Sequence, residues 1–270
     1  AKIARNLSAG RVQSVALRLL VEKEKSIKEF KPEEFWDVSF IAKDSNDIEI
    51  NFDLPRKKTD PLLSAEEAKN IQALIENTNL SISSISQRPV KTRPKPPFIT
   101  STLQQAASTR LGFNVKRTMR VAQKLYENGF ITYMRTDAPS LSKESIQDAR
   151  AFIGDELGSS YLTNAPRIYS SQENAQEAHE AIRPTSASRK PGMITSSSDE
   201  EQRLYELIWQ QFISSQMPDA EYLSTSAKVN LEGYEFVARG REVVFDGFTK
   251  VIPPRKDEDA ILPPLAEGDT

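Results

Sequence analysis

A tyrosine and an arginine two positions apart are the first residues with clear chemical potential. Tyr133 and Arg135 follow a predicted basic helix, in a stretch that looks extended. Residues i and i+2 of an extended segment face the same side. Arginine can hold two phosphate oxygens, so a phenol beside it could attack a phosphodiester. Most tyrosines serve packing or hydrogen bonding instead, and Tyr133 alone does not decide between these roles.

The only histidine of the chain lies in a second polar stretch, Gln176–Thr185. If this stretch is helical, His179 and Arg183 share a face at the i,i+4 spacing, and Pro184 ends the helix. A histidine and an arginine on one face could both point at a phosphate. The alternative is a surface or structural histidine with no chemical role.

A third stretch, Asn6–Ser14, combines small residues and polar donors at the start of a predicted helix. Its polar members include Ser8, Arg11 and Gln13. Helix N-termini of this kind can seat a phosphate. The simpler interpretation is a helix cap at Ser8.

The charge is distributed unevenly along the chain. The totals are 36 Lys+Arg and 38 Asp+Glu, a net charge of −2, yet no Asp or Glu occurs from Asn77 to Tyr126. Positive residues in that stretch are Arg88, Lys91, Arg93, Lys95, Arg110, Lys116, Arg117, Arg120 and Lys124. This pattern predicts a groove for a polyanion, although a solvated basic helix and linker would look similar.

Hydrophobic periodicity predicts the elements that position these residues. The first half favours a helix over 11–30, strands over 35–42 and 48–54, a helix capped by Ser64, and a short strand near 80–85. The four prolines of 88–97 predict an extended connector.

The second half begins with helical patterns. Apolar stripes at 103–111 and 115–125, separated by Gly112, predict a helix-turn-helix or an ordinary helical hairpin. Further helices are expected after Ser142 and Ser198, and strands over 227–251 with a turn at Glu232-Gly233.

These elements predict a mixed α and β fold, in which an all-α module is inserted into a β-rich module. The expected divisions are 1–29, a helical segment of a larger domain; 30–92 with 218–270, a β-rich arch and hinge; and 93–217, a helical domain that carries Tyr133. The two connectors should lie close together and act as a hinge.

Composition excludes several classes of protein. The chain has no Cys, which rules out disulfide scaffolds, thiol nucleophiles and thiolate zinc sites within these residues. It also has no P-loop for ATP, no H-E-x-x-H motif and no apolar run long enough to cross a bilayer.

Three segments together resemble the type IA DNA topoisomerases in their bacterial topoisomerase I form. Gly129–Asp137 is similar to the active-site segment of that family, and Gln176–Thr185 and Asn6–Ser14 are similar to two further signatures. Their order and spacing also fit, and the similarity runs through nearly the whole chain.

The resemblance implies a toroid fragment and a set of site residues. Tyr133 would attack one DNA strand and form a 5′-phosphotyrosyl link, and Arg135 would hold the scissile phosphate. His179, Asp137 and Arg183 would assist, while Ser8, Arg11 and Gln13 would line the single-strand groove. Further DNA-binding candidates are Arg110, Lys116, Arg117, Arg120 and Thr185.

The same resemblance implies the cofactor, partners and location. The whole enzyme would relax negative supercoils without ATP, using Mg²⁺ held by a D-x-D-x-E cluster. That cluster and the zinc modules do not occur in this sequence, so none of its residues is expected to bind a metal. Partners would be single-stranded or negatively supercoiled DNA and the missing domains of the same polypeptide, in the bacterial cytoplasm at the nucleoid, with no membrane.

The departures from the family predict an inactive fragment of a longer protein. Without the Mg²⁺-binding domain, the chain should fold but neither cleave nor relax DNA alone. Ala138 stands where bacterial relatives usually have Ser, which puts a hydroxyl contact there in doubt.

Two other functions are compatible with parts of the sequence. One is a non-enzymatic helix-turn-helix domain that binds nucleic acid. The other is a different tyrosine-based strand-transfer enzyme: a recombinase would form a 3′-phosphotyrosyl link, and a rolling-circle nuclease would need a histidine metal site.

Overall fold

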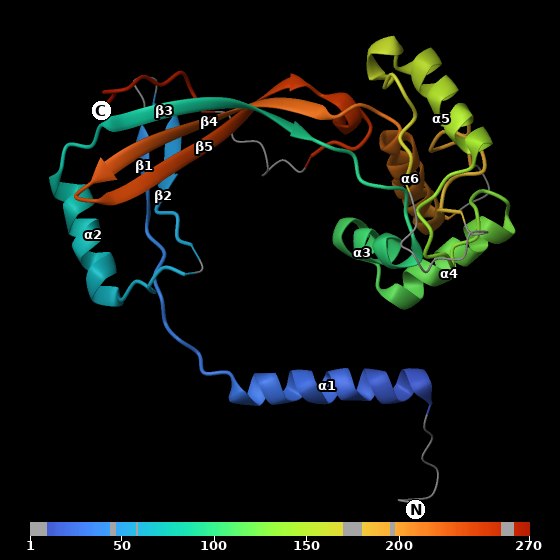
Figure 1. Cartoon of the computed structure of the whole chain (residues 1–270), viewed down its shortest axis with the longest axis horizontal. Coiled ribbons are helices and arrows are strands. Elements are labelled where there is room, and N and C mark those ends of the chain that lie inside the picture. The colour runs from blue at the N-terminus through green and yellow to red at the C-terminus, as the bar shows by residue number, and fades with distance from the viewer. Residues whose placement is uncertain (1–9, 44–46, 58, 170–179, 195–197, 255–261) are drawn as a thin grey trace, which may run out of the picture.

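The computed structural model describes residues 10–43, 47–57, 59–169, 180–194, 198–254 and 262–270. It has the mixed α and β composition that the sequence predicts. Strands gather on one side of the molecule and most helices on the other (Figure 1). No helix in the described ranges is long and apolar enough to span a membrane.

Five strands form one antiparallel sheet in the order β1-β2-β5-β4-β3. Their bounds are β1 Ser39–Lys43, β2 Glu49–Asp53, β3 Ile82–Thr92, β4 Ala220–Leu231 and β5 Tyr234–Phe245. The predicted turn between β4 and β5 is confirmed: Glu232 and Gly233 both have positive φ, 49° and 93°. This geometry suits a two-residue hairpin between right-handed twisted strands.

Helix α2, Ala65–Asn77, packs with the short strands into the core at one end of the sheet. Ile50 and Phe52 alternate with exposed neighbours in β2, which confirms the half-buried strand. Phe52 stacks on Phe40 of β1 with ring centroids 5.0 Å apart. The predicted capping box at Ser64 is also present.

Strand β3 corrects one prediction. The sequence favours a short strand ending near 85 and an extended connector over 88–97, but β3 continues to Thr92, where it pairs with Ala220 of β4. β3 is an edge strand, so the missing N–H of Pro89 removes no central ladder bond. The connector proper is therefore Arg93–Pro97.

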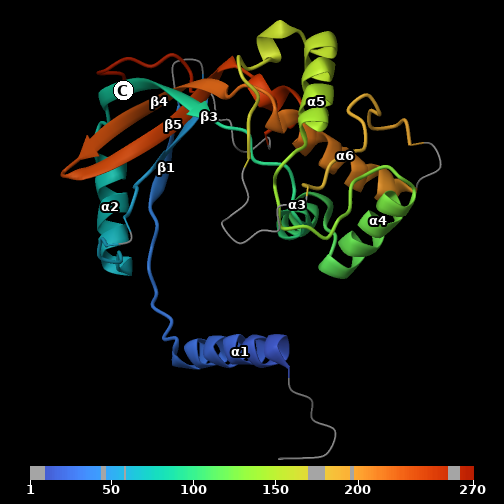
Figure 2. The same ribbon diagram turned by 45° about the vertical axis from the view of Figure 1, so that its right-hand side comes forward.

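Four helices follow β3 and precede β4 along the chain. They are α3 Thr100–Leu111, α4 Val115–Glu127, α5 Lys143–Glu156 and α6 Asp199–Ser215, with a short 3₁₀ turn η1 at Ser159–Tyr161. Gly112, in the left-handed region at φ 69°, ends α3. Leu204, Ile208 and Phe212 of α6 are buried in a core shared with α3, α4 and α5. Figure 2 shows the ribbon of α6 among those of α3, α4 and α5.

The two connectors between strands and helices lie side by side, as predicted. Asp219 precedes β4 and forms ion pairs with Arg93 at 3.9 Å and with Arg167 at 2.5 Å. The Arg167 Nε also donates to the Met217 carbonyl at 2.8 Å. A second 3₁₀ turn, η2 at Gly247–Lys250, packs here through the bond from the Phe248 amide to the Pro218 carbonyl.

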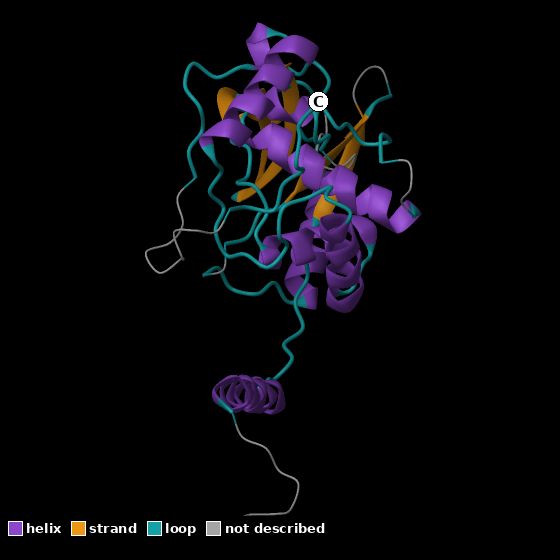
Figure 3. Cartoon of the chain, turned by 90° about the vertical axis from the view of Figure 1, so that its right-hand side faces the viewer, coloured by secondary structure: helices purple, strands orange, loops and turns teal. Residues whose placement is uncertain are grey.

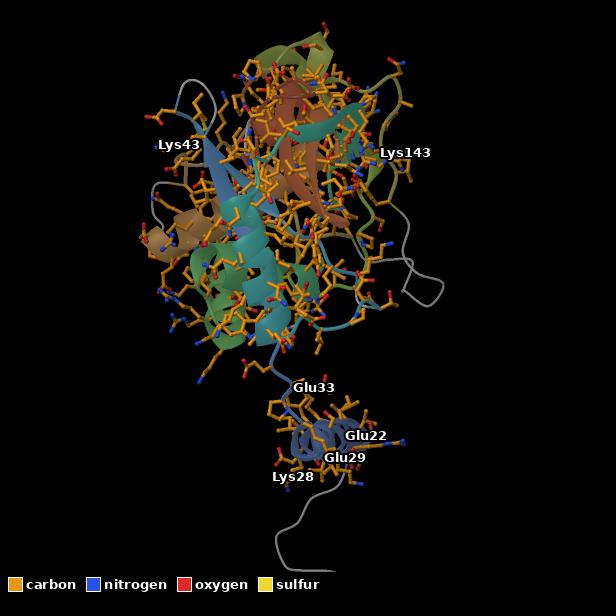
Figure 4. The ribbon with its side chains drawn as sticks, turned by 90° about the vertical axis from the view of Figure 1, so that its left-hand side faces the viewer. Glu22, Lys28, Glu29, Glu33, Lys43 and Lys143 are labelled. Atoms are coloured by element: carbon orange, nitrogen blue, oxygen red, sulfur yellow. The ribbon has the colours of Figure 1, made fainter. Side chains whose placement is uncertain are left out.

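Helix α1, Arg11–Glu29, confirms the first predicted helix but lies apart from the rest of the molecule (Figures 1 and 3). Its predicted apolar face is exposed, including Val12, Val15 and Leu20. The charged side chains of Glu22, Lys28 and Glu29 surround the same helix (Figure 4).

Candidate active site around Tyr133

The segment from Tyr133 to Asp137 alternates between exposed and buried side chains. Tyr133, Arg135 and Asp137 are exposed, whereas Met134 and Thr136 are buried. This alternation places the phenol, the guanidinium and the carboxylate on the outer side of the segment, although the backbone bends at Thr132 and Met134 and forms no strand there. The two buried residues anchor that segment to the helical core.

Backbone contacts with residues 181–184 fix the segment on one side. Ile131 and Pro184 form an antiparallel bridge, and the Thr132 amide donates to the Arg183 carbonyl at 2.9 Å. The Thr132 hydroxyl donates to the Ala181 carbonyl at 2.7 Å. The Arg183 amide in turn donates to the Thr132 hydroxyl at 3.0 Å, so three hydrogen bonds hold the residue before the tyrosine against a neighbouring chain segment.

The first residue of α3 fixes the other side. The Thr100 hydroxyl lies 2.9 Å from the Met134 carbonyl and 3.0 Å from the Thr136 carbonyl, and the Thr136 amide lies 3.0 Å from the same hydroxyl. The Thr100 amide also donates to the Thr136 carbonyl at 3.0 Å. Nothing in the sequence singles out Thr100, because its partners are 34 and 36 residues away.

A cavity of about 450 Å³ opens beside Arg135. Its lining residues are Ile99, Thr100, Ser101, Gln104, Arg135, Thr136 and Asp137. The cavity is formed between the start of α3 and the segment that follows Tyr133. A ligand group bound there would contact Arg135, which is the next exposed residue after Tyr133.

The stretch that carries Arg183 is not helical where the structure describes it. Ile182 forms a bridge with Phe98 and Pro184 forms one with Ile131, so residues 180–185 run extended. Pairing with two other segments outweighs the helical spacing of the sequence. His179 lies outside the described residues, so its predicted place beside Arg183 stays a prediction.

The Arg183 side chain contacts a carboxylate rather than facing outward. Its Nε and Nη2 donate to the two oxygens of Glu180 at 2.8 and 2.9 Å, and Nη1 donates to the Pro184 carbonyl. Its side chain is only 15% exposed. The backbone of Arg183 therefore supports the Tyr133 segment, while its guanidinium is held by a bidentate ion pair.

Glu180 is a residue that sequence reasoning missed. Besides Arg183, it accepts from the Ser142 amide at 2.9 Å and the Ser145 hydroxyl at 3.1 Å, at the start of α5. Burial by itself would raise the pKa of Glu180, but these hydrogen bonds and the charge of Arg183 outweigh burial and lower it. Its position three residues before Arg183 was the available signal.

Part of the basic stretch is balanced by acids from a distant segment. Arg117 donates to Glu200 from Nε at 2.9 Å and from Nη2 at 2.5 Å, and Arg120 donates to the same carboxylate at 3.2 Å. The hydrogen bond from Arg117 is the main reason why the pKa of Glu200 is lowered. Glu200 lies in the first turn of α6, so α4 turns these arginines toward α6.

The other predicted DNA-binding residues occupy different places. Arg110 and Lys116 are exposed on α3 and α4, and Gln13 is exposed on α1. The Thr185 hydroxyl donates to the Gly129 carbonyl at 2.9 Å. Ser8 and the side chain of Arg11 lie outside the described residues.

Ala138 is fully buried, and its amide donates to the Thr136 hydroxyl at 3.1 Å. A serine at this position would face the interior. The departure from the family pattern therefore falls on the inner side of the segment, opposite Arg135 and Asp137.

Metal donors do not gather in the described part of the chain: it holds no group of three or more His, Cys, Asp or Glu placed to bind an ion. Mg²⁺ sites in proteins are built from oxygen ligands, with one or two carboxylates completed by water and phosphate.

Comparisons with known proteins agree with the three motifs. A family model described as DNA topoisomerase matches residues 1–270. DNA topoisomerase 1 of Pseudomonas aeruginosa is 48% identical over 272 residues, covering 99% of this chain, and that of Escherichia coli is 46% identical over 265 residues, covering 97%. The chain spans about 31% of the length of each relative.

A solved structure is similar as well. The full-length topoisomerase I of Thermotoga maritima aligns with a TM-score of 0.77 at 33% identity, over 97% of this chain and 43% of that protein. The family model matches every residue, and relatives share nearly half of their aligned residues with this chain. This chain therefore belongs to the type IA family of bacterial DNA topoisomerases.

Proposed function

We propose that this chain carries the nucleophile of a type IA DNA topoisomerase. In this proposal the Tyr133 phenol oxygen attacks the phosphorus of one DNA strand. The new bond is a 5′-phosphotyrosyl link, and the bond between phosphorus and the 3′ oxygen breaks. The phenol proton leaves to solvent or a base, and the departing 3′ oxygen takes up a proton from solvent or an acid, so that a free 3′-hydroxyl results. The observation that carries the proposal is the exposed Tyr133 beside exposed Arg135, on a segment fixed at both ends.

Arg135 supplies the charge that the reaction needs. A guanidinium can bind two phosphate oxygens and stabilise the charge that develops during attack. The cavity beside Arg135 leaves room for a phosphate and part of its strand. Asp137 lies at the next exposed position and is proposed to assist around the bound strand together with His179. Arg183 is proposed to assist through its backbone, which supports the segment that carries Tyr133.

Strand passage and resealing follow from the covalent link. The phosphotyrosyl ester retains the energy of the broken linkage, so the 3′-hydroxyl can attack it and restore the strand without ATP. We propose that the helices carrying Tyr133 act as a lid on the β-rich arch, and that the divisions 1–29, 30–92 with 218–270, and 93–217 describe these parts.

The whole enzyme is proposed to need segments outside this chain. The relatives are about three times as long as this chain. The D-x-D-x-E cluster that the family resemblance associates with Mg²⁺ does not occur in this sequence. We therefore infer that Mg²⁺ is held elsewhere in the full-length protein, in the bacterial cytoplasm at the nucleoid. This chain alone should neither cleave an oligonucleotide nor relax a plasmid.

Covalent trapping tests the proposal. The full-length protein, incubated with a 3′-labelled single-stranded oligonucleotide and Mg²⁺, should retain the label after denaturation, and Tyr133→Phe should abolish that retention. Equal trapping by the variant would remove Tyr133 from the mechanism. Efficient plasmid relaxation by the 270-residue chain alone would refute its dependence on other segments.

A further inference from the structure

We propose that Tyr126 is a positioning residue that orients the Tyr133 ring for attack. The two rings meet edge to face, with centroids 5.2 Å apart and planes inclined by 63°. This is a favoured geometry for aromatic pairs, because the positive edge of one ring meets the negative face of the other. The inference rests on the proposed role of Tyr133 as nucleophile.

The backbone of Tyr133 is fixed, so the position of its oxygen depends on the side-chain rotamer. Thr132 and Met134, on either side, are held by the bonds to Ala181 and Thr100. The ring itself is 47% exposed, so the core does not enclose it. Rotation of χ1 between staggered wells would move the phenol oxygen by several ångström. A contact that favours one well therefore acts directly on the attack geometry.

Tyr126 is mounted rigidly enough to supply that contact. It lies in the last turn of α4, next to Leu125, which is fully buried. The Tyr126 carbonyl accepts from the Gly129 amide at 2.9 Å, and the Leu125 carbonyl accepts from the Phe130 amide at 2.9 Å. These bonds start the tight turn that leads from α4 to Tyr133.

The pair contributes little to the hydrophobic core. Tyr126 is 41% exposed, and both rings lie at the surface beside the segment with Arg135. Leucine has a higher helix propensity than tyrosine, so Tyr126→Leu should preserve α4 while it removes the aromatic ring. The variant therefore separates ring orientation from folding.

The test measures single-turnover cleavage and DNA binding separately in the full-length protein. An aromatic pair of this kind corresponds to a factor of about two to twelve in an equilibrium or rate constant. Tyr126→Leu should lower the cleavage rate constant of a 3′-labelled single-stranded oligonucleotide by about that factor, with an unchanged Kd. Tyr126→Phe, which retains the ring, should restore the rate.

The outcomes distinguish this inference from the proposed function. An unchanged cleavage rate in Tyr126→Leu overturns the positioning role, as does a changed Kd with an unchanged rate, which would make Tyr126 a stacking platform for a base. Loss of activity in Tyr126→Phe would transfer the role to the hydroxyl and also overturn it. Trapping that survives Tyr133→Phe would instead refute the nucleophile itself.

Discussion

Replacing Glu180 should destabilise the support of the Tyr133 segment. This carboxylate joins the extended segment 180–185 to the start of α5 through hydrogen bonds from Arg183, Ser142 and Ser145. Its side chain is 28% exposed and that of Arg183 is 15% exposed, so the ion pair is largely shielded from water. Glu180→Ala leaves a mostly buried guanidinium without its carboxylate.

The expected loss follows from the bonds removed. Hydrogen bonds to charged groups contribute about 1.5–3 kcal/mol, and breaking a fully buried ion pair costs about 3–5 kcal/mol. Partial exposure and the remaining bond from Arg183 to Pro184 reduce this, so Glu180→Ala should lower the free energy of unfolding by about 2–3 kcal/mol. Glu180→Gln retains one acceptor oxygen and should lose about 1–2 kcal/mol.

Acid should reduce the difference in the free energy of unfolding between the wild type and Glu180→Gln. The pKa of Glu180 is lowered in the folded state from its ordinary value of 4.5. The unfolded chain therefore binds the proton first, and the stabilisation is complete above pH 4.5 and is lost as the pH falls through the folded pKa. The free-energy gap should be full at neutral pH and shrink below about pH 4.5.

Thermal unfolding followed by circular dichroism at pH 7 and through the acid range measures both effects. At about 2–4 °C per kcal/mol for a chain of this size, Glu180→Ala should unfold roughly 4–12 °C below the wild type. The control is Glu156→Gln, whose exposed ion pair with Lys190 should contribute at most about 1 kcal/mol. Equal unfolding temperatures for Glu180→Ala and the wild type would refute the reasoning.

Two further predictions concern the junction and the basic stretch. Gly247→Ala should lower the free energy of unfolding by more than about 2 kcal/mol, because its Cβ would lie 2.3 Å from the Asp219 carbonyl oxygen at a φ of +48°. Gly233→Ala has open space around it and should cost about 1 kcal/mol. Equal shifts of the unfolding temperature in the two variants would contradict this. Glu200→Gln should free Arg117 and Arg120 from their carboxylate partner, so that both can bind phosphate. The affinity for single-stranded DNA, measured by fluorescence anisotropy, should then rise roughly two- to five-fold in low salt. An unchanged affinity would mean that these arginines do not bind DNA.

Local rules predicted those elements whose signals lie within a few residues. The capping box at Ser64, the N-cap at Ser198, the glycine that ends α3 and the turn at Glu232-Gly233 all depend on contacts only a few positions apart. The alternation of exposed and buried side chains from Tyr133 to Asp137 was equally local, since it concerns five consecutive residues. These features could be located from the sequence because no distant partner decides them.

Distant partners decided what the sequence missed. Strand β3 tolerates Pro89 because of its edge position, which depends on β4 more than a hundred residues later. Arg117 pairs with Glu200 across 83 residues, so part of the charge of a stretch without acids is balanced in the fold. Arg183 turns to Glu180 because residues 180–185 pair with other segments instead of forming a helix.

Mapping the covalent bond tests the central claim most directly. In the full-length protein, trapped DNA is trimmed with nuclease and the protein is cut with trypsin, which should release the peptide 125–135 with both Tyr126 and Tyr133. Fragment-ion mass spectrometry should assign the remaining nucleotide to Tyr133, joined through its 5′ phosphate. A nucleotide on Tyr126 or elsewhere, or one joined through a 3′ phosphate, would contradict the account.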